Sequence, residues 1–200
     1  MKVTRQQVAR HRARILDRAA KLFREKGFGG IGVADIMKSA GLTHGAFYGH
    51  FASKDELMAQ ACAKAAAMAH EGWTGAAGRH PENPLAAIVR PYLSARHRDD
   101  RANGCLYAAL GAEAGRESGA VRGVFTEGLR ESIELLAKIA PGRSRAARRE
   151  KAVATIAGLV GALTLARAVD DQALSDEILR AAAVRLSPDT TPARARRKPS

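Results

Sequence analysis

The 200-residue sequence has little of what a disulfide-bonded, β-rich or secreted protein needs. Its two cysteines, Cys62 and Cys105, are too few for a disulfide framework. Aromatic residues make up 4% of the chain, which argues against sheets because strands favour aromatic and β-branched side chains. The N-terminal segment MKVTRQQVARHRARILD lacks the apolar core of a signal peptide. We therefore expect a cytoplasmic, mainly helical protein.

Long runs of large apolar residues are also missing. The nearest approach is residues 152–169, which carry no charge before Arg167. This stretch is built mostly from alanine, glycine and threonine, so its hydrophobicity is low for a membrane span of about 20 residues. A helix buried at a protein interface is the better interpretation, and we expect no membrane association.

No constellation of catalytic residues is visible, so we expect neither an enzyme nor a cofactor. The sequence offers no Ser-His-acid spacing and no metal-ligand set, and His44 and His50 have no supporting cysteine or carboxylate. Residues 27–32 spell GxGxxG, but a dinucleotide site needs a preceding strand, whereas a helical pattern precedes this loop. We interpret these glycines as a flexible turn.

What the chain has in excess is positive charge. Its formal net charge is +13 and its pI is about 10.5. Residues 1–70 hold 12 lysines and arginines against five acidic residues, and the last seven residues add Arg194, Arg196, Arg197 and Lys198. Residues 71–193 are almost balanced, with 17 basic against 15 acidic residues. Such segregation favours a polyanionic partner over a generic solubilising surface.

Apolar periodicity predicts helices throughout, separated by glycine and proline. We expect residues 1–9 to form a frayed basic arm, 72–83 to form a loop, and 187–200 to be a disordered basic tail. Pro91 should kink the helix that contains it. The expected helices cover residues 10–26, 32–39, 43–50, 53–70, 84–98, 120–140, 145–169 and 175–186, and a further helix is expected to start near residues 103–105.

Residues 32–54 form a helix-turn-helix pattern. Gly41 suits the left-handed conformation that ends a helix, and Phe47 and Phe51, four residues apart, are expected to point inward. The remaining positions of the second helix form a polar, outward face, as expected of a helix that enters the major groove of DNA. Ser53 and Glu56 form a capping box for the next helix.

Residues 10–70 resemble the DNA-binding domain of the TetR/AcrR family of bacterial transcriptional repressors. The matching residues are 34–36 (ADI), 40–43 (AGLT), 47–51 (FYGHF) and 53–57 (SKDEL). The family commonly has threonine at the cap where this chain has Gly32. The resemblance implies an all-α fold: an N-terminal three-helix helix-turn-helix domain followed by a helical ligand-binding and dimerisation domain. The predicted division is 1–52 for DNA binding, 53–71 for a connecting helix, 72–186 for regulation and dimerisation, and 187–200 for the tail.

Position in the motif predicts the DNA contacts. The start of the recognition helix reaches base edges in such motifs, and four residues lie there, namely Thr43, His44, Gly45 and Ala46. The resemblance implies that Tyr48, His50 and Lys54 bind phosphates. The helix dipole at Lys54 adds to the attraction. The alternative for Tyr48 is a half-buried packing residue.

The resemblance further implies a ligand pocket beside residues 84–98 and a homodimer formed through the last two helices. Four aromatic residues are candidate pocket walls, although residues of this kind more often belong to a plain core: Trp73, Tyr92, Tyr107 and Phe125. Cys105, near a helix start and close in sequence to Arg98 and Arg101, is a candidate electrophile sensor with a lowered pKa. An ordinary small buried residue is the alternative for this cysteine.

For the dimer, the sequence offers small residues four apart at Ala154, Gly158 and Ala162, with apolar bulk at Val153, Ile156, Val160 and Leu163. The predicted function is a ligand-responsive, sequence-specific repressor that binds a palindromic operator as a homodimer and is released by a small-molecule or electrophile inducer. The alternatives are a non-specific architectural DNA-binding protein and an enzyme with an accidental helix-turn-helix.

Overall fold

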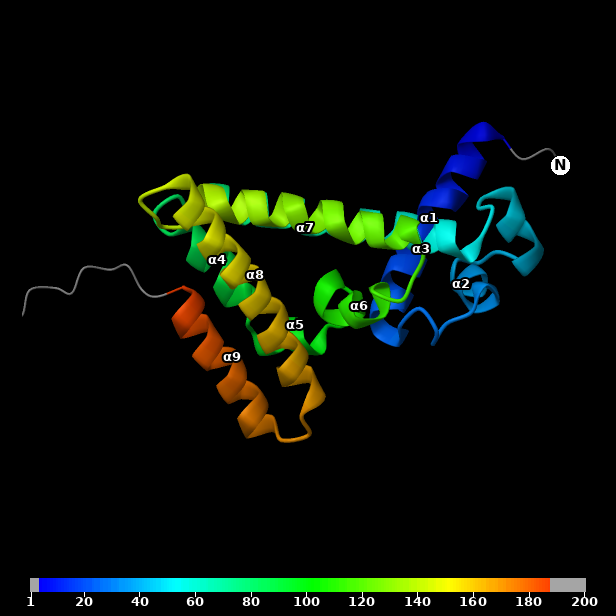
Figure 1. Ribbon diagram of the computed structural model, residues 1–200. Helices are drawn as coiled ribbons and strands as arrows, with labels where there is room; N and C mark the ends of the chain where they lie inside the picture. Colours follow the sequence, from blue (N-terminus) through cyan, green and yellow to red (C-terminus); the bar gives the residue numbers. More distant parts are fainter. Residues whose placement is uncertain (1–3, 188–200) are drawn as a thin grey trace, which may run out of the picture.

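The computed structural model describes residues 4–187, and every regular element in that range is a helix (Figure 1). The predicted all-α fold is confirmed. The predicted disordered tail lies outside the described residues except for Ser187, which is buried. The elements in order are α1 (Arg5–Lys26), α2 (Val33–Ser39), the 3₁₀ helix η1 (His44–Gly49), α3 (Lys54–Arg79), α4 (Pro84–Tyr92), α5 (Ala95–Asp99), α6 (Leu106–Ala114), α7 (Gly119–Ile139), α8 (Arg145–Ala168) and α9 (Gln172–Leu186).

The first helix begins earlier than predicted. The expected arm of residues 1–9 was wrong from Arg5 onward, because Thr4 and Gln7 cap this helix reciprocally. The Thr4 hydroxyl accepts from the Gln7 amide at 3.2 Å, and the Gln7 side chain accepts from the Thr4 amide at 2.8 Å. Two otherwise unpaired donors are satisfied, which fixes the start of α1.

The third helix is longer than predicted. Instead of ending near residue 70, α3 runs through Gly72, Gly75 and Gly78 to Arg79, so the expected loop over 72–83 is reduced to a short turn. Each glycine costs a helix about 1 kcal/mol relative to alanine. Tertiary packing offsets that cost here, since Trp73 and its neighbours on α3 pack against a hydrophobic core and α3 lies along α7.

The kink expected at Pro91 is a full break. Pro91 lacks an amide hydrogen, and α4 ends one residue later at Tyr92. Ser94 then starts α5, because its hydroxyl accepts from the His97 amide at 3.2 Å and donates to the Pro91 carbonyl at 2.7 Å. The predicted single helix over 84–98 is therefore two helices separated by a short turn at residues 93–94.

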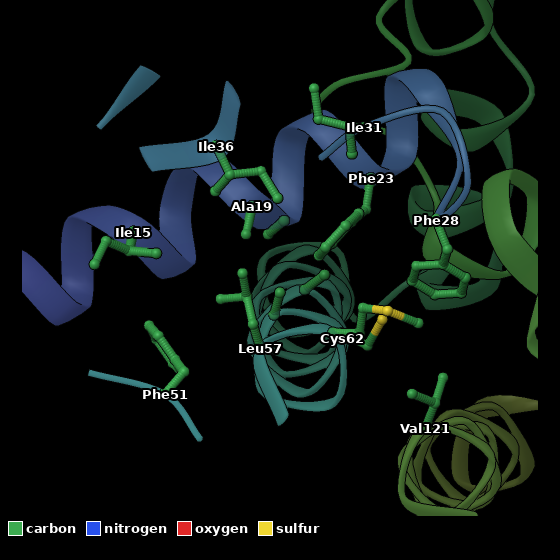
Figure 2. Close-up of a cluster of buried hydrophobic side chains, with 14 of the residues drawn as sticks. Ile15, Ala19, Phe23, Phe28, Ile31, Ile36, Phe51, Leu57, Cys62 and Val121 are labelled. Atoms are coloured by element: carbon green, nitrogen blue, oxygen red, sulfur yellow. The ribbon is translucent and has the colours of Figure 1, made fainter. Parts of the chain in front are cut away.

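Two hydrophobic cores hold the molecule together. The first joins α1, α2, η1 and the start of α3, and it reaches Leu106 and Leu110 of α6. Figure 2 shows Ile15 and Phe23 of α1 directed towards Leu57 of α3. The second core joins α4, the far end of α7, α8 and α9. Because α3 contributes to both cores, it connects the two ends of the molecule.

Helix α8 lies at the far end from α1 and pairs with α9 (Figure 1). By length and composition alone it is apolar enough to cross a membrane, a test that core helices of soluble proteins also pass. It is the one such helix among residues 4–187. Its bounds agree closely with the predicted 145–169.

Candidate nucleic-acid interface and ligand cavity

Helices α1, α2 and η1, residues 5–53 with their connecting turns, form a unit that we call the reading head. Phe47 and Phe51 stack at 5.7 Å between ring centroids, and both are almost fully buried, as predicted. Gly41 has φ of +67° and turns the chain between α2 and η1. The aromatic core therefore holds η1 at a fixed angle to α2 and leaves its other face to solvent.

The outward face of η1 carries most of the predicted base-contacting residues. Thr43, His44 and Gly45 are exposed, and a Cβ added at Gly45 would meet nothing within 4 Å. The fold therefore does not require glycine there. Ala46, by contrast, packs partly against the core, so it is less available than predicted. The element itself is a short 3₁₀ helix rather than the expected α-helix.

The three predicted phosphate contacts differ in their surroundings. Tyr48 is 72% exposed, which rules out the packing alternative for this side chain. His50 is half-buried, its Nδ1 has no partner, and burial together with nearby His11 and Arg12 lowers its pKa. Lys54 already donates from Nζ to the Phe28 carbonyl at 2.6 Å. Its ammonium has two further hydrogens, so this bond fixes the side chain without using up its donors.

Arg12 holds the reading head to α3, a role that sequence patterns did not indicate. Its guanidinium lies 4.3 Å over the Phe51 ring, donates to the His50 carbonyl and reaches Gln60 at 2.8 Å. It also contacts Glu56 at 3.4 Å. The pKa of Glu56 is lowered, first by the Ala52 amide that its carboxylate accepts and then by Arg12. The predicted capping box is thus present at Ser53 with the carboxylate bound one residue earlier.

A cavity of about 540 Å³ lies between α3, α4, α5, α6 and α7, beside the segment where a pocket was predicted. Trp73, Tyr92, Tyr107 and Cys105 all line it. Phe125 does not, and that prediction was wrong: its ring packs edge-on against Tyr107 at 5.7 Å, behind the wall. The charged residues of the lining, among them Arg79, Arg96 and Asp100, are exposed and therefore sit at the rim.

The surroundings of Cys105 do not favour a thiolate. Burial raises the pKa of its thiol, and this outweighs the nearby Tyr92 hydroxyl, the α6 amides and the charge of Arg167. Arg98, expected to activate the thiol, instead binds Asp99 and Asp176, each at 2.7 Å. The predicted lowering of the pKa was therefore wrong. Burial also raises the pKa of Cys62 to about 12, so neither thiol is activated by its surroundings.

His97 connects two walls of the cavity. Its Nδ1 lies 2.7 Å from the Tyr92 carbonyl, and its Nε2 accepts from the Cys105 amide at 3.1 Å. Because a carbonyl only accepts, Nδ1 carries the proton and the ring is neutral. Burial lowers the pKa of His97, which agrees with this arrangement. The end of α4 and the start of α6 are thus held by one imidazole.

The outer face of α8 and α9 exposes apolar side chains. Val153 and Leu165 of α8 are 44% and 58% exposed, and Leu174 and Val184 of α9 are 43% and 63% exposed. The small residues predicted for this face are only partly there. Ala154 is exposed, but Ala162 is buried, and a Cβ at Gly158 would meet Leu186 of the same chain at 3.0 Å. Ile156 and Leu163 belong to the core of the chain itself.

Among residues 4–187, no group of three or more histidine, cysteine or acidic side chains is placed to hold a metal ion. The two candidate binding sites are the polar surface of the reading head and the largely apolar cavity.

The sequence similarity to known proteins lies mainly in the reading head. The sequence profile described as "Bacterial regulatory proteins, tetR family" matches residues 15–61. The HTH-type transcriptional regulator AcrR of Shigella flexneri is 39% identical over 57 residues, which are 28% of this chain and 26% of that protein. The HTH-type transcriptional repressor KstR2 of Mycobacterium tuberculosis is 42% identical over 52 residues, 26% of each. The matches thus span about a quarter of these curated relatives.

The whole fold is similar to solved structures. The reduced form of E. coli NemR superposes with a TM-score of 0.74 at 23% identity, covering 88% of this chain and 95% of that one. A TetR-family regulator from Cytophaga hutchinsonii gives 0.74 at 21% identity, covering 93% and 96%. Helices α4–α9 therefore share the fold found behind the DNA-binding domain in these proteins. The tetR profile over residues 15–61 identifies the reading head as the DNA-binding domain of a TetR-family helix-turn-helix transcriptional regulator, and the helices behind it share the fold of these solved structures.

Proposed function

We propose that this regulator is a repressor that binds a palindromic operator as a homodimer and is released by a small-molecule inducer. The observation that carries the proposal is the exposed polar face of η1, held beside Lys54 by the aromatic core of the reading head. A bacterial chromosome supplies the partner, so the protein acts in the cytoplasm.

The DNA contacts divide into two kinds. Thr43, His44 and Gly45 stand at the exposed start of η1, where side chains and backbone reach base edges and select sequence. Ala46 contributes a methyl edge only. Tyr48, with its hydroxyl in solvent, and Lys54, at the N-terminus of α3, bind phosphates and set the register. His50 is half-buried, so its contribution is to orient the turn as much as to meet a phosphate.

A homodimer is supported by the outer face of α8 and α9. Between Lys151 and Arg167, α8 presents only uncharged residues, and Val153 and Leu165 are largely exposed. Burying such a face against a second copy removes apolar surface from water, at about 25 cal/mol per Å². The interface is then made by these exposed side chains, with Leu174 and Val184 of α9, rather than by the full stripe of small residues.

The cavity is the proposed inducer site. Residues 72–186, which include the end of α3, form the part of the chain that we call the regulatory half. The walls are aromatic, with Trp73 and Tyr92 packed edge-on at 6.0 Å, and the charged groups lie at the rim. This favours an uncharged aromatic molecule that binds reversibly. The electrophile alternative requires Cys105 to react, and burial of its thiol opposes that route.

Binding-site selection from a random duplex library tests the proposal. We expect recovery of an inverted repeat by the wild-type chain. The variant Leu165→Arg places a charge on the proposed interface and should retain one half-site with a loss of affinity of at least about 100-fold. Met68→Arg, at a similarly exposed apolar residue of α3, is the matched control and should behave as wild type. Retention of DNA without sequence preference would support the architectural alternative instead.

A further inference from the structure

Helix α6 extends from the cavity to the reading head, and each of its ends is fixed by a hydrogen bond to another element (Figure 1). At its start, the Cys105 amide is bound to His97, in the cavity wall. Near its end, Glu113 accepts from the Phe28 amide at 2.7 Å, in the turn between α1 and α2. A helix of this length spans about 13 Å and moves as a rigid body.

Both backbone polar groups of Phe28 are hydrogen-bonded. Its amide donates to Glu113 of α6, and its carbonyl accepts from Lys54, the proposed phosphate contact at the start of α3. The Phe28 ring is buried against Phe23 at 5.4 Å. Gly27 has φ of +78°, and a Cβ there would lie 2.6 Å from the Glu113 carboxylate, so glycine is needed for this approach.

A buried arginine makes a second bridge to the same region. Arg24, near the end of α1, is 9% exposed and donates to the Ala102 carbonyl at 2.7 Å, three residues before Cys105. Desolvation lowers the pKa of Arg24. A cation held at this cost in the interior joins the loop before α6 to the reading head, so this loop and Glu113 are the two points at which the α6 region contacts it through hydrogen bonds.

We propose that Glu113 is a positioning residue that couples the cavity to DNA binding by holding Phe28, and through Phe28 the Lys54 side chain, in the DNA-binding geometry. This inference rests on the proposed function and names the contacts that couple the inducer site to the DNA-binding surface. Displacement of α6 at Cys105 by a molecule in the cavity withdraws Glu113 from the Phe28 amide. The turn then relaxes, and Lys54 loses the carbonyl that orients it.

The test uses reciprocity, because a cavity that changes DNA affinity must itself be changed by DNA. Trp73 is the one tryptophan in the sequence and lines the cavity, so its quenching by acrylamide reports on the cavity. The probe is the duplex recovered by the selection described above. Saturation with this duplex should change Trp73 quenching in wild type and in Glu134→Ala, which removes an exposed carboxylate on α7. In Glu113→Ala, which removes the acceptor of the Phe28 amide, the response should be lost.

A double-mutant cycle identifies the route. If Glu113 acts through Lys54, Glu113→Ala weakens duplex binding in the wild-type background and has little effect in Lys54→Ala, a coupling of about threefold or more. The Glu134→Ala and Lys54→Ala effects should be additive. Glu113→Asp keeps the charge but shortens the side chain, so it should resemble Glu113→Ala, and it replaces that variant if thermal unfolding shows Glu113→Ala to be misfolded.

The outcomes separate this proposal from the proposed function. Failure of the wild-type chain to bind any selected duplex overturns the proposed function and this proposal with it. Normal duplex binding with an unresponsive Trp73 overturns the coupling alone. So does a Glu113→Ala protein that keeps the Trp73 response, or one whose effect simply adds to that of Lys54→Ala.

Discussion

The reading head and the regulatory half, residues 72–186, are built from different side chains. Four of the five phenylalanines of the chain lie in the reading head, and all four are buried: Phe23, Phe28, Phe47 and Phe51. The core of the regulatory half is mainly leucine, isoleucine, valine and alanine, with the aromatic rings of Trp73 and Tyr92 at a cavity instead. Large rings packed together fix one shape, whereas small residues around a cavity leave room for a ligand.

The difference should be measurable as a tolerance to added volume. Ala19→Leu inserts three carbons into the reading-head core at a residue with no exposed surface, and it should destabilise the fold by about 1–3 kcal/mol. Ala76→Leu points the same group at the cavity wall and should change stability by at most about 0.5 kcal/mol. Urea unfolding measures both. Equal losses would show that the cavity wall is as tightly packed as the reading head.

A smaller effect concerns pH and the wall residue His97. Its folded pKa is lowered by burial, so the unfolded chain takes up the proton first as pH falls through the ordinary histidine value of about 6.5. Stability should therefore be constant above that pH and decrease below it. His50, whose pKa is also lowered, acts in the same direction from the reading head.

Separating the two histidines sharpens the comparison. Between about pH 7.5 and pH 5.5, the melting temperature of wild type should fall, and the fall should be smaller in His97→Gln. His50→Gln removes the contribution of the reading head and should have the lesser effect, because the half-buried His50 makes no hydrogen bond from Nδ1 whereas both ring nitrogens of His97 are bound. A pH profile unchanged in His97→Gln would contradict a neutral, buried imidazole between α4 and α6.

Local pattern was sufficient for much of the fold. Periodicity predicted α7 and α8 nearly to the residue, and the spacing of Phe47 and Phe51 predicted their burial. It failed where tertiary packing overrides local preference, as in the three glycines within α3. It also treated Pro91 as a kink, because the new cap at Ser94 depends on a bond that only the folded turn allows.

The site was predictable to the same limit. Exposure of Tyr48 and the walls Trp73 and Tyr92 followed from motif and resemblance. The bond between Glu113 and Phe28 joins residues 85 apart, and no periodicity signals such a pair. The pKa of Cys105 was predicted in the wrong direction, because proximity in sequence reveals neither the burial of the thiol nor that Arg98 binds Asp99 and Asp176.

The central claim is that the reading head, in the shape its aromatic core fixes, binds DNA with Lys54 on a phosphate. The most direct measurement is the salt dependence of binding to the selected duplex by Lys54→Ala. Its log–log slope should be smaller than that of wild type by about one, with affinity lost about equally for all sequences. The control is Lys64→Ala, which should keep the wild-type slope. Lys64 lies further along α3, and its ammonium is 2.5 Å from the carboxylate of Asp17 on α1. An unchanged slope for Lys54→Ala would contradict the account.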